Sequence, residues 1–270
     1  MNDADARRLL AVAKTATSAA SELVRSRPPR TLTWKGDRDV TSDVDMSVEN
    51  LIRNYLHRHT PGAGFLGEEE GGSNLGDGSY WILDPIDGTI NFLHGLPLCA
   101  ISLSLVHNGV AVVAVIDLPF LSAQYSALKD HGSFVNDVQL AVSSTHSLDA
   151  ALISVDQYTF GEHEHKNRLR HTLAERLAAH AQRIRMLGTS AIDLAWTAQG
   201  RLDACVLLGN KPWDTSAGVL IAQEAGARLL DLDGTDHSTD SVATIAVTPP
   251  LEDALMAVIR EAVTATAVSG

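Results

Sequence analysis

The order of the predicted helices and strands indicates an α/β protein in which an α+β lobe is followed by an α/β lobe. Two helical stretches open the chain, and a β-rich section follows them. After about residue 150, strands and helices alternate, which is typical of an α/β lobe. We therefore expect an N-terminal lobe over 1–145 and a C-terminal lobe over 146–270.

The first half begins with two predicted helices. Apolar residues recur at helical spacing over 4–25, and Pro28-Pro29 ends this helix. A second helix is predicted to start near Ser42–Asp45 and to end before Pro61-Gly62.

The β-rich section is marked by short apolar runs and turn residues. Asn108-Gly109 predicts a hairpin, because this pair is the strongest short turn signal. Pro85 is expected to end the strand that precedes it, and Gly71–Gly78 is expected to be a polar loop. The predicted strands cover 64–67, 80–83, 101–106, 110–117, 124–129 and 132–136.

The second half alternates between strand and helix patterns. Strands are predicted at 151–155, 184–187 and 204–208. Helices are predicted at 166–182, 191–199, 216–225 and 251–265.

Composition narrows the possible functions. The chain has 21 basic and 33 acidic residues, a formal charge of −12, which excludes generic nucleic-acid binding because such a surface repels phosphate backbones. No apolar run approaches the roughly 20 residues that a membrane span needs. The acidic start lacks the features of a signal peptide, so we expect a cytoplasmic protein without membrane partners. Cys99 and Cys205 are expected to be buried, reduced thiols.

The most informative stretch is Tyr80–Phe92. Its apolar strand delivers Asp84 to the carboxyl end, Asp87 follows three positions later, and Gly88 permits a tight turn before Thr89 starts a short helix. Carboxylates bind hard cations, and the free N–H groups of a helix start bind phosphate oxygens. Asp-Pro and Asp-Gly are also common turn pairs, so a purely structural role remains the alternative for each aspartate.

Three further acidic positions strengthen the case for a metal site. Glu68-Glu69-Glu70 follows a predicted strand, Asp45 lies at the start of the second helix, and Asp214 precedes a helix in the other half. A solvated run and helix capping are the alternatives. If these carboxylates converge in a cleft between the lobes, they need metal ions for neutrality, and oxygen-only ligands favour Mg²⁺ over zinc.

The motifs Gly67-Glu68-Glu69, Asp84-Pro85-Ile86-Asp87-Gly88-Thr89 and Trp213-Asp214-x-x-Ala217-Gly218 resemble, in this order, the inositol monophosphatase family. The resemblance spans most of the chain. It implies a layered αβαβα sandwich of the type shared with fructose-1,6-bisphosphatase. It also implies a lithium-sensitive, Mg²⁺-dependent phosphatase that forms a homodimer.

The family's metal ligands carry over position by position. Glu68, Asp84 and the backbone carbonyl of Ile86 resemble the ligands of a first Mg²⁺. Asp84, Asp87 and Asp214 resemble those of a second ion. Glu68 would also help to hold a weaker third ion, so two or three ions are expected.

The remaining site residues carry over in the same way. The backbone amides of Gly88 and Thr89 resemble the family's phosphate-binding groups. Thr89 and Asp45 resemble the pair that orients the attacking water, which makes Glu68, Thr89 and Asp45 the expected catalytic residues. Gly188, Thr189 and Ser190 are expected to contact the substrate.

Two positions depart from the family pattern. The segment Val40–Asp45 is one residue longer than the pattern, and we prefer Asp45 over Asp43 because Asp45 keeps the spacing to Glu49. Leu207 stands where the family usually has a glutamate that binds the inositol ring, seven residues before Asp214. An apolar side chain there cannot accept hydrogen bonds, which weakens the prediction of inositol specificity.

The leading hypothesis is a phosphoric monoester hydrolase that uses metal-activated water to convert inositol monophosphate to inositol and phosphate. One alternative is the same chemistry on another small phosphate, such as histidinol phosphate or fructose 1,6-bisphosphate. A second alternative is a non-catalytic regulatory binding protein that keeps the fold. The first two hypotheses imply a small phosphate ester as the partner.

Overall fold

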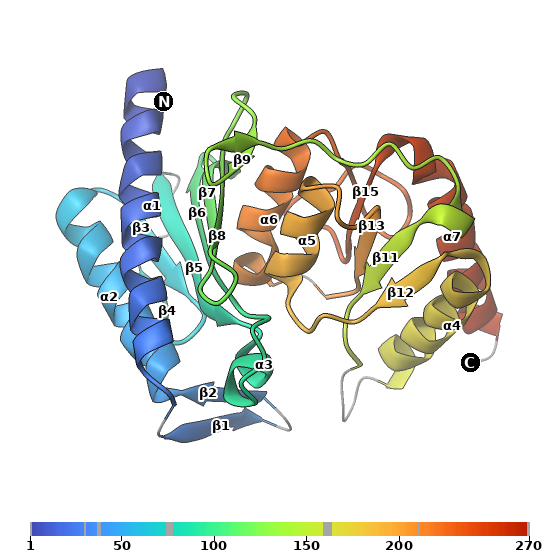
Figure 1. Cartoon of the computed structure of the whole chain (residues 1–270), viewed down its shortest axis with the longest axis horizontal. Coiled ribbons are helices and arrows are strands. Elements are labelled where there is room, and N and C mark those ends of the chain that lie inside the picture. Colours follow the sequence, from blue (N-terminus) through green and yellow to red (C-terminus); the bar gives the residue numbers. More distant parts are fainter. Residues whose placement is uncertain are drawn as a thin grey trace.

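The computed structural model describes residues 2–29, 31–36, 39–73, 78–158, 164–209 and 211–268. Its elements form five layers: a helix pair, an eight-stranded sheet, a second helix pair, a five-stranded sheet and an outer helix pair (Figure 1). This is the αβαβα order that the family resemblance implies, and the predicted fold class is confirmed.

The first helical layer consists of α1 (Asp3–Ser26) and α2 (Asp43–His59). The apolar stripe of α1 is buried from Leu9 to Val24, which confirms the helix read from its spacing. The Ser42 side chain caps α2, as its position before the apolar pattern indicates. A two-stranded ribbon of β1 (Leu32–Gly36) and β2 (Asp39–Ser42) connects the helices and was not predicted.

The eight-stranded sheet has the order β10-β9-β8-β7-β6-β5-β3-β4. Neighbours are antiparallel except for β3 and β5, which run parallel. Asn108 and Gly109 both have positive φ, 51° and 76°, as a tight hairpin turn requires, so the predicted hairpin is confirmed. The strands are β3 (Gly64–Gly67), β4 (Gly71–Ser73), β5 (Ser79–Asp87), β6 (Ala100–His107), β7 (Val110–Leu118), β8 (Ala123–Leu128), β9 (Ser133–Val135) and β10 (Val138–Gln139).

Two predictions for this sheet are wrong. Strand β5 does not end at Pro85 but continues to Asp87, because its register against β6 shifts between Asp84 and Asp87. Such an irregularity accommodates a proline that has no N–H to donate. Gly71–Ser73, expected to be loop, pairs with β3 as β4, and the next four residues of that predicted loop, 74–77, lie outside the described residues.

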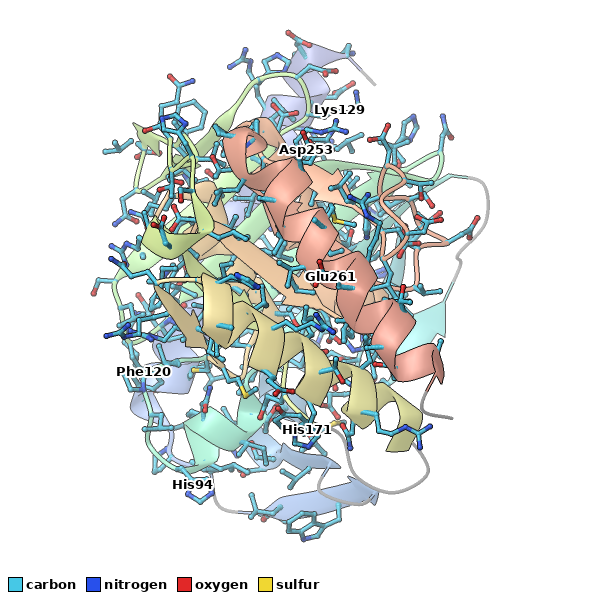
Figure 2. All side chains as sticks on the ribbon, turned by 90° about the vertical axis from the view of Figure 1, so that its right-hand side faces the viewer. His94, Phe120, Lys129, His171, Asp253 and Glu261 are labelled. Carbon is cyan, nitrogen blue, oxygen red and sulfur yellow. The ribbon has the colours of Figure 1, made fainter. Side chains whose placement is uncertain are left out.

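The second half supplies the other three layers. Helices α5 (Ser190–Ala198) and α6 (Pro212–Glu224) lie between the two sheets, whereas α4 (Glu164–His180) and α7 (Glu252–Val268) cover the outer face. Figure 2 looks onto this outer face, where Glu261 of α7 forms an ion pair with Arg176 of α4 at 2.7 Å. Two short 3₁₀ helices, Leu148–Ala150 and Pro249–Leu251, join these elements.

The five-stranded sheet has the order β12-β11-β13-β15-β14. Strands β11, β12 and β13 are parallel, as expected for alternating strands and helices, but β15 runs antiparallel to both neighbours. The last two strands follow helix α6 and were not predicted from their short apolar runs. The strands are β11 (Leu152–Val155), β12 (Arg183–Arg185), β13 (Ala204–Leu207), β14 (Arg228–Leu230) and β15 (Thr244–Val247).

The middle helices α5 and α6 join the two halves through a shared core. Ile192 on α5 and Ile221 on α6 pack in one cluster with Ile116 of the first sheet and Leu207 of the second. The division at residue 145 therefore stays a prediction, although the chain does leave the first sheet after Gln139 and enter the second at Leu152.

Two other expectations concern the buried thiols and the membrane. Cys99 and Cys205 are both buried and free, as predicted. In the part of the chain that the structure describes, no helix has the length and apolar character needed to cross a bilayer.

Candidate active site

A cavity of about 260 Å³ lies where the end of β5 faces the start of α5 and the start of α6. The residues that line it come from both halves of the chain and are mostly polar. They are Val40, Glu68, Asp84, Ile86, Asp87, Gly88, Thr89, Ile90, Asp156, Gln157, Gly188, Thr189, Ser190, Asp193, Lys211 and Asp214. Every predicted metal-ligating and substrate-contacting residue is therefore at this cavity.

The end of β5 forms the first wall. The Asp84 carboxylate accepts a hydrogen bond from the Ile86 N–H at 3.0 Å, which holds the irregular stretch of the strand. Gly88 follows with φ of +85°, and a Cβ at this position would lie 2.8 Å from the Leu98 carbonyl oxygen. Glycine is thus required for the turn into the short helix α3 (Thr89–Leu93).

Thr89 connects this wall to helix α2. Its hydroxyl lies 2.9 Å from the Ile86 carbonyl oxygen and 3.2 Å from Asp45 Oδ1. A hydroxyl has one proton, so Thr89 donates to one of these acceptors at a time. Its oxygen lone pairs can meanwhile accept a hydrogen bond from a third group, such as water.

Asp45 is fixed by the first turn of α2. It is only 1% exposed, and its Oδ2 accepts hydrogen bonds from the Ser42 N–H at 3.0 Å and the Ser42 hydroxyl at 2.5 Å. Together with the bonds from the α2 backbone to Ser42 Oγ, these contacts make a capping box. Asp45 therefore stabilises the helix start with one oxygen and contacts Thr89 with the other.

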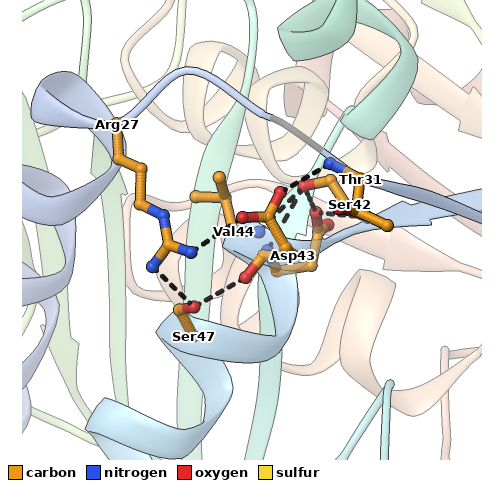
Figure 3. Close-up of polar contacts among 7 residues, drawn as sticks. Arg27, Thr31, Ser42, Asp43, Val44 and Ser47 are labelled. Atoms are coloured by element: carbon orange, nitrogen blue, oxygen red, sulfur yellow. Dashed lines mark hydrogen bonds and ion pairs between the residues drawn. The ribbon is translucent and has the colours of Figure 1, made fainter.

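Asp43, the alternative to Asp45, makes different contacts. Its carboxylate pairs with Arg27 at 2.7 Å and accepts a hydrogen bond from the Thr31 N–H at 3.1 Å (Figure 3). Ser47 completes this group by donating its hydroxyl to the Asp43 carbonyl oxygen at 2.6 Å. Of the two aspartates, Asp45 is the one in contact with Thr89.

Asp87 reaches across to the second half of the chain. Its Oδ2 accepts hydrogen bonds from the Thr189 hydroxyl at 2.5 Å and from the Ala191 N–H at 2.6 Å. Both donors belong to the start of α5, where Thr189 is also the N-cap. The positive end of this helix therefore faces a predicted metal ligand.

Glu68 and Asp214 complete the acidic lining from two other elements. Glu68 lies in the turn after β3, and its N–H donates to the Leu83 carbonyl oxygen at 3.1 Å. Asp214 is the third residue of α6, where the first turn of a helix favours an acidic side chain. The prediction that Glu68 follows a strand agrees with the structure, whereas Asp214, expected before a helix, lies inside the first turn of α6 because this helix starts at Pro212.

The carboxylates in this cavity disfavour one another's charge. Burial raises the pKa of Asp84 well above its usual range, and Glu68, Asp87 and Asp214 raise it further. Burial also raises the pKa of Asp87 and of Asp45 to about 6, although hydrogen bonds from Thr189 and from Ser42 oppose the two shifts. Concentrated negative charge of this kind is what a bound cation relieves.

The chemistry of these donors fits a hard divalent cation. The candidate ligands are carboxylate oxygens and one carbonyl oxygen, which Mg²⁺ prefers, and they include neither thiolate nor imidazole. Among the described residues that line the cavity, Lys211 is the only basic one, and its Nζ lies 5.8 Å from the centre of the Trp213 ring. No group of three described His, Cys, Asp or Glu side chains is already arranged as a ligand cage. An ion would therefore have to draw these mutually repelling carboxylates together.

Four cavity residues were missed from the sequence: Asp156, Gln157, Asp193 and Lys211. Asp156 directly follows the apolar strand β11, the same signal that identified Asp84. Its carboxylate binds Arg170 through two hydrogen bonds, at 3.0 and 2.7 Å, and accepts the Leu208 N–H at 2.9 Å. This aspartate is therefore neutralised by its own partners.

Asp193 is in the opposite situation. It lies in the first turn of α5, is 2% exposed, and its Oδ1 has no hydrogen-bond partner among the described residues. Burial raises its pKa well above the usual range. A carboxyl oxygen buried beside a cavity without a partner is suited to bind a donor group of a ligand.

Leu207 does not lie where the comparison of motifs suggests. Its side chain is 1% exposed, packs in the core between α5, α6 and the second sheet, and is not among the cavity residues. The expectation that position 207 faces the leaving group is therefore not supported. The motif spacing gave the correct strand but could not show that the leucine is part of the core.

The chain is similar to known proteins over most of its length. The pattern of the inositol monophosphatase family matches residues 5–265. An inositol-1-monophosphatase of Mesorhizobium japonicum is 35% identical over 235 residues, which are 86% of each chain. A fructose-1,6-bisphosphatase/inositol-1-monophosphatase of Thermotoga maritima is 32% identical and covers 84% of this chain and 85% of its own.

A solved structure agrees over almost the whole length. The extragenic suppressor protein suhB of Bartonella henselae superposes with a TM-score of 0.88 at 28% identity, covering 94% of this chain and 98% of the other. Together with the family match over 5–265, this similarity shows that the chain belongs to the inositol monophosphatase family and is a phosphoric monoester hydrolase.

Proposed function

We propose that this phosphatase is Mg²⁺-dependent and hydrolyses inositol monophosphate to inositol and phosphate. One observation carries the proposal: Glu68, Asp84, Asp87 and Asp214 line one cavity, and the Thr89–Asp45 hydrogen bond lies at its edge. Mg²⁺ would be held by these four carboxylates and the Ile86 carbonyl oxygen, in a set of two or three ions. It would supply positive charge opposite both the attacking and the leaving oxygen.

The chain's own groups would orient the attacking water. When the Thr89 hydroxyl donates to Asp45 Oδ1, its oxygen can accept a hydrogen bond from water at the cavity edge. Glu68 would hold the same water from the other wall. Because the Asp45 carboxylate is fixed by Ser42, the water would be oriented without a large loss of side-chain entropy at the moment of reaction.

The phosphate group would bind at the turn between β5 and α3. The N–H groups of Gly88 and Thr89 begin a helix, where backbone donors have no acceptor within the helix itself. They would donate to phosphate oxygens whose negative charge increases during the reaction. Gly88 also allows a close backbone approach, since it has no Cβ.

The leaving alcohol would contact the start of α5. Gly188 and Ser190 would contact it directly, whereas the Thr189 hydroxyl already donates to Asp87 and would contribute mainly by holding that aspartate. The Asp193 carboxyl would accept a hydrogen bond from a ring hydroxyl, which supplies a polar contact that Leu207 cannot make.

Other small phosphates remain alternative substrates. The Thermotoga maritima relative is named fructose-1,6-bisphosphatase/inositol-1-monophosphatase, after both activities. Fructose 1,6-bisphosphate and histidinol phosphate would use the same phosphate and metal contacts and differ only at the leaving group. We also propose that the protein is cytoplasmic. We further propose that it forms a homodimer, which light scattering on the purified protein would test.

The decisive experiment is phosphate release from a panel of inositol, sugar and histidinol phosphates, with and without Mg²⁺. We expect Mg²⁺-dependent release, fastest for inositol 1-phosphate. Asp45→Asn should reduce turnover strongly, whereas Asp43→Asn, which changes a neighbouring aspartate that pairs with Arg27, is the matched control. Release that is indifferent to Mg²⁺ would refute the metal proposal, and no release from any compound would favour a regulatory binding role.

A further inference from the structure

Glu49 is a fully buried carboxylate next to the candidate site, and the reaction as described above does not use it. It lies on α2, four residues after Asp45, and has 0% exposure. Residues four apart share one face of a helix, so α2 presents Asp45 and Glu49 side by side toward the eight-stranded sheet. A buried acidic side chain needs specific partners to be tolerated.

The partners of Glu49 are backbone N–H groups of the turn that carries Glu68. Its Oε2 accepts a hydrogen bond from the Glu69 N–H at 3.0 Å, and its Oε1 accepts one from the Glu70 N–H at 3.1 Å. The Glu68 N–H is held separately by the Leu83 carbonyl oxygen of β5 at 3.1 Å. All three N–H groups of this turn therefore have fixed partners.

Gly67 allows the carboxylate to approach so closely. A Cβ at this position would lie 2.4 Å from the carboxyl carbon of Glu49, which is far inside van der Waals contact. Glycine is thus required here by space rather than by φ. The residue directly before Glu68 is packed against Glu49.

Arg53 balances the charge of Glu49 one helical turn later. Its guanidinium pairs with Glu49 Oε1 at 2.5 Å and with Glu70 at 3.3 Å, and it lies 4.4 Å from the centre of the Phe65 ring. A planar guanidinium suits this combination of ion pair and ring contact. Glu49 therefore has a cationic partner as well as the two N–H donors of the turn.

We propose that Glu49 is a positioning residue that sets the orientation of Glu68 and thereby the affinity of the site for Mg²⁺. The proposal rests on the proposed function in one respect, the role of Glu68 as a metal ligand. Residues that hydrogen-bond to metal ligands and so orient them often raise metal affinity 10- to 100-fold. Glu49 acts on the ligand through backbone hydrogen bonds of the turn and is not among the cavity residues.

The test is Glu49→Gln, which keeps the size of the side chain but replaces one acceptor oxygen with an NH₂ group. One of the two turn N–H groups then loses its partner. We expect Mg²⁺ binding to the substrate-free protein, measured by titration calorimetry, to weaken about tenfold or more. The Mg²⁺ concentration for half-maximal turnover should rise in parallel, while kcat at saturating Mg²⁺ stays within about threefold of wild type.

Glu70→Gln is the matched control. It changes a side chain on the same turn that also contacts Arg53, but it leaves both backbone N–H bonds to Glu49 in place. We expect its Mg²⁺ affinity to match wild type. Glu49→Asp, which keeps the charge but is one methylene shorter, is the second variant if Glu49→Gln fails to fold, and it should also weaken Mg²⁺ binding.

Two results separate this inference from the proposed function. If Glu68→Gln leaves Mg²⁺ affinity unchanged, Glu68 is not a ligand, and both the metal assignment and the role of Glu49 fail. If Glu68→Gln weakens Mg²⁺ binding but folded Glu49 variants bind it like wild type, only the positioning role is overturned. A lower melting temperature with unchanged Mg²⁺ affinity would mean that Glu49 serves stability alone.

Discussion

The Asp87 carboxylate accepts a hydrogen bond from the Thr189 hydroxyl at 2.5 Å, and the two residues are 102 positions apart in the chain. Asp87 ends a strand of the first sheet, and Thr189 caps the middle helix α5. One carboxylate thus lines the candidate metal site and holds the two halves together. Binding of an ion to Asp87 is therefore expected to affect the junction between the halves.

The first prediction concerns this aspartate. Asp87→Asn removes one negative charge but keeps an oxygen that can accept from Thr189 and Ala191, so the fold should persist. We expect kcat to fall by at least about a hundredfold, as for loss of a main electrostatic group. Steady-state kinetics at saturating Mg²⁺ measure this, with exposed Asp137→Asn as the control, and near-normal turnover would contradict the role of Asp87.

The contact between Asp87 and Thr189 could not be predicted from the sequence. The predicted elements included strand β5 and helix α5, but a hydrogen bond between them depends on how the sheets and the middle helices pack. The same limit explains Glu49, whose partners come from a turn about 20 residues further along the chain. Local patterns place residues on elements, and only tertiary packing brings those elements together.

The acidic positions were predictable for a different reason. Glu68 follows a strand, Asp214 lies in the first turn of a helix and Asp84 lies near the carboxyl end of β5, and all three features are local. Asp156 follows β11 in the same way and could have been found by the same rule. Leu207 was misjudged because motif spacing gives the position along a strand but not the face that meets the core.

A second prediction concerns stability and pH in the absence of metal. Burial raises the pKa of Asp45 and Asp87 from 3.8 to about 6, so the folded protein binds protons more tightly than the unfolded chain between these values. The free energy of unfolding is therefore highest below the pKa of the unfolded chain and decreases as pH rises through about 6. Each of the two carboxyl groups changes the free energy of unfolding by at most about 3 kcal/mol over this range.

Thermal melts of metal-free protein from pH 4.5 to 7.5 would measure this effect. We expect the melting temperature to fall across this range more steeply for wild type than for Asp87→Asn. Added Mg²⁺ should restore stability at pH 7.5, since an ion bound only by the folded state stabilises it. Equal slopes for the two proteins would show that Asp87 has no raised pKa.

A third prediction concerns lithium. A site made of carboxylate oxygens also suits small hard monovalent cations, which could occupy it after phosphate forms. We expect inhibition by LiCl in roughly the millimolar range, as for weak hard-cation sites. Turnover in NaCl of the same ionic strength is the control. An equal response to both salts would contradict a cation site formed by these carboxylates.

A fourth prediction concerns Asp193 and substrate choice. If its unpartnered oxygen accepts a ring hydroxyl, Asp193→Ala, which removes the acceptor, should lower kcat/KM for inositol 1-phosphate about tenfold relative to ethyl phosphate, which has no such hydroxyl. Taking the ratio of the two substrates in each variant removes differences in expression and metal loading. An unchanged ratio would mean that Asp193 does not reach the leaving group.

The last prediction concerns Leu207, where sequence and structure disagree most directly. The family comparison suggests that Leu207→Glu would restore a contact with inositol, but the side chain is 1% exposed and packs among the core residues of α5 and α6. A glutamate there would bury a charge without a partner, at a cost of about 3–5 kcal/mol. For a chain of this size, we expect a fall in melting temperature of roughly 10 °C. Leu207→Met, a volume-conserving change, should cost less than about 1.5 kcal/mol and is the matched control.

Calorimetric melts and the ratio of kcat/KM for inositol 1-phosphate to that for glycerol 2-phosphate test both readings of Leu207 together. Because Leu207 does not line the cavity, the folded fraction of Leu207→Glu should show no gain in this ratio. A variant that melts near wild type and gains about tenfold or more for inositol 1-phosphate would place the side chain against the substrate. That result would require the Leu207 side chain of β13 to point away from α5 and toward the cavity, contrary to its packing in the core.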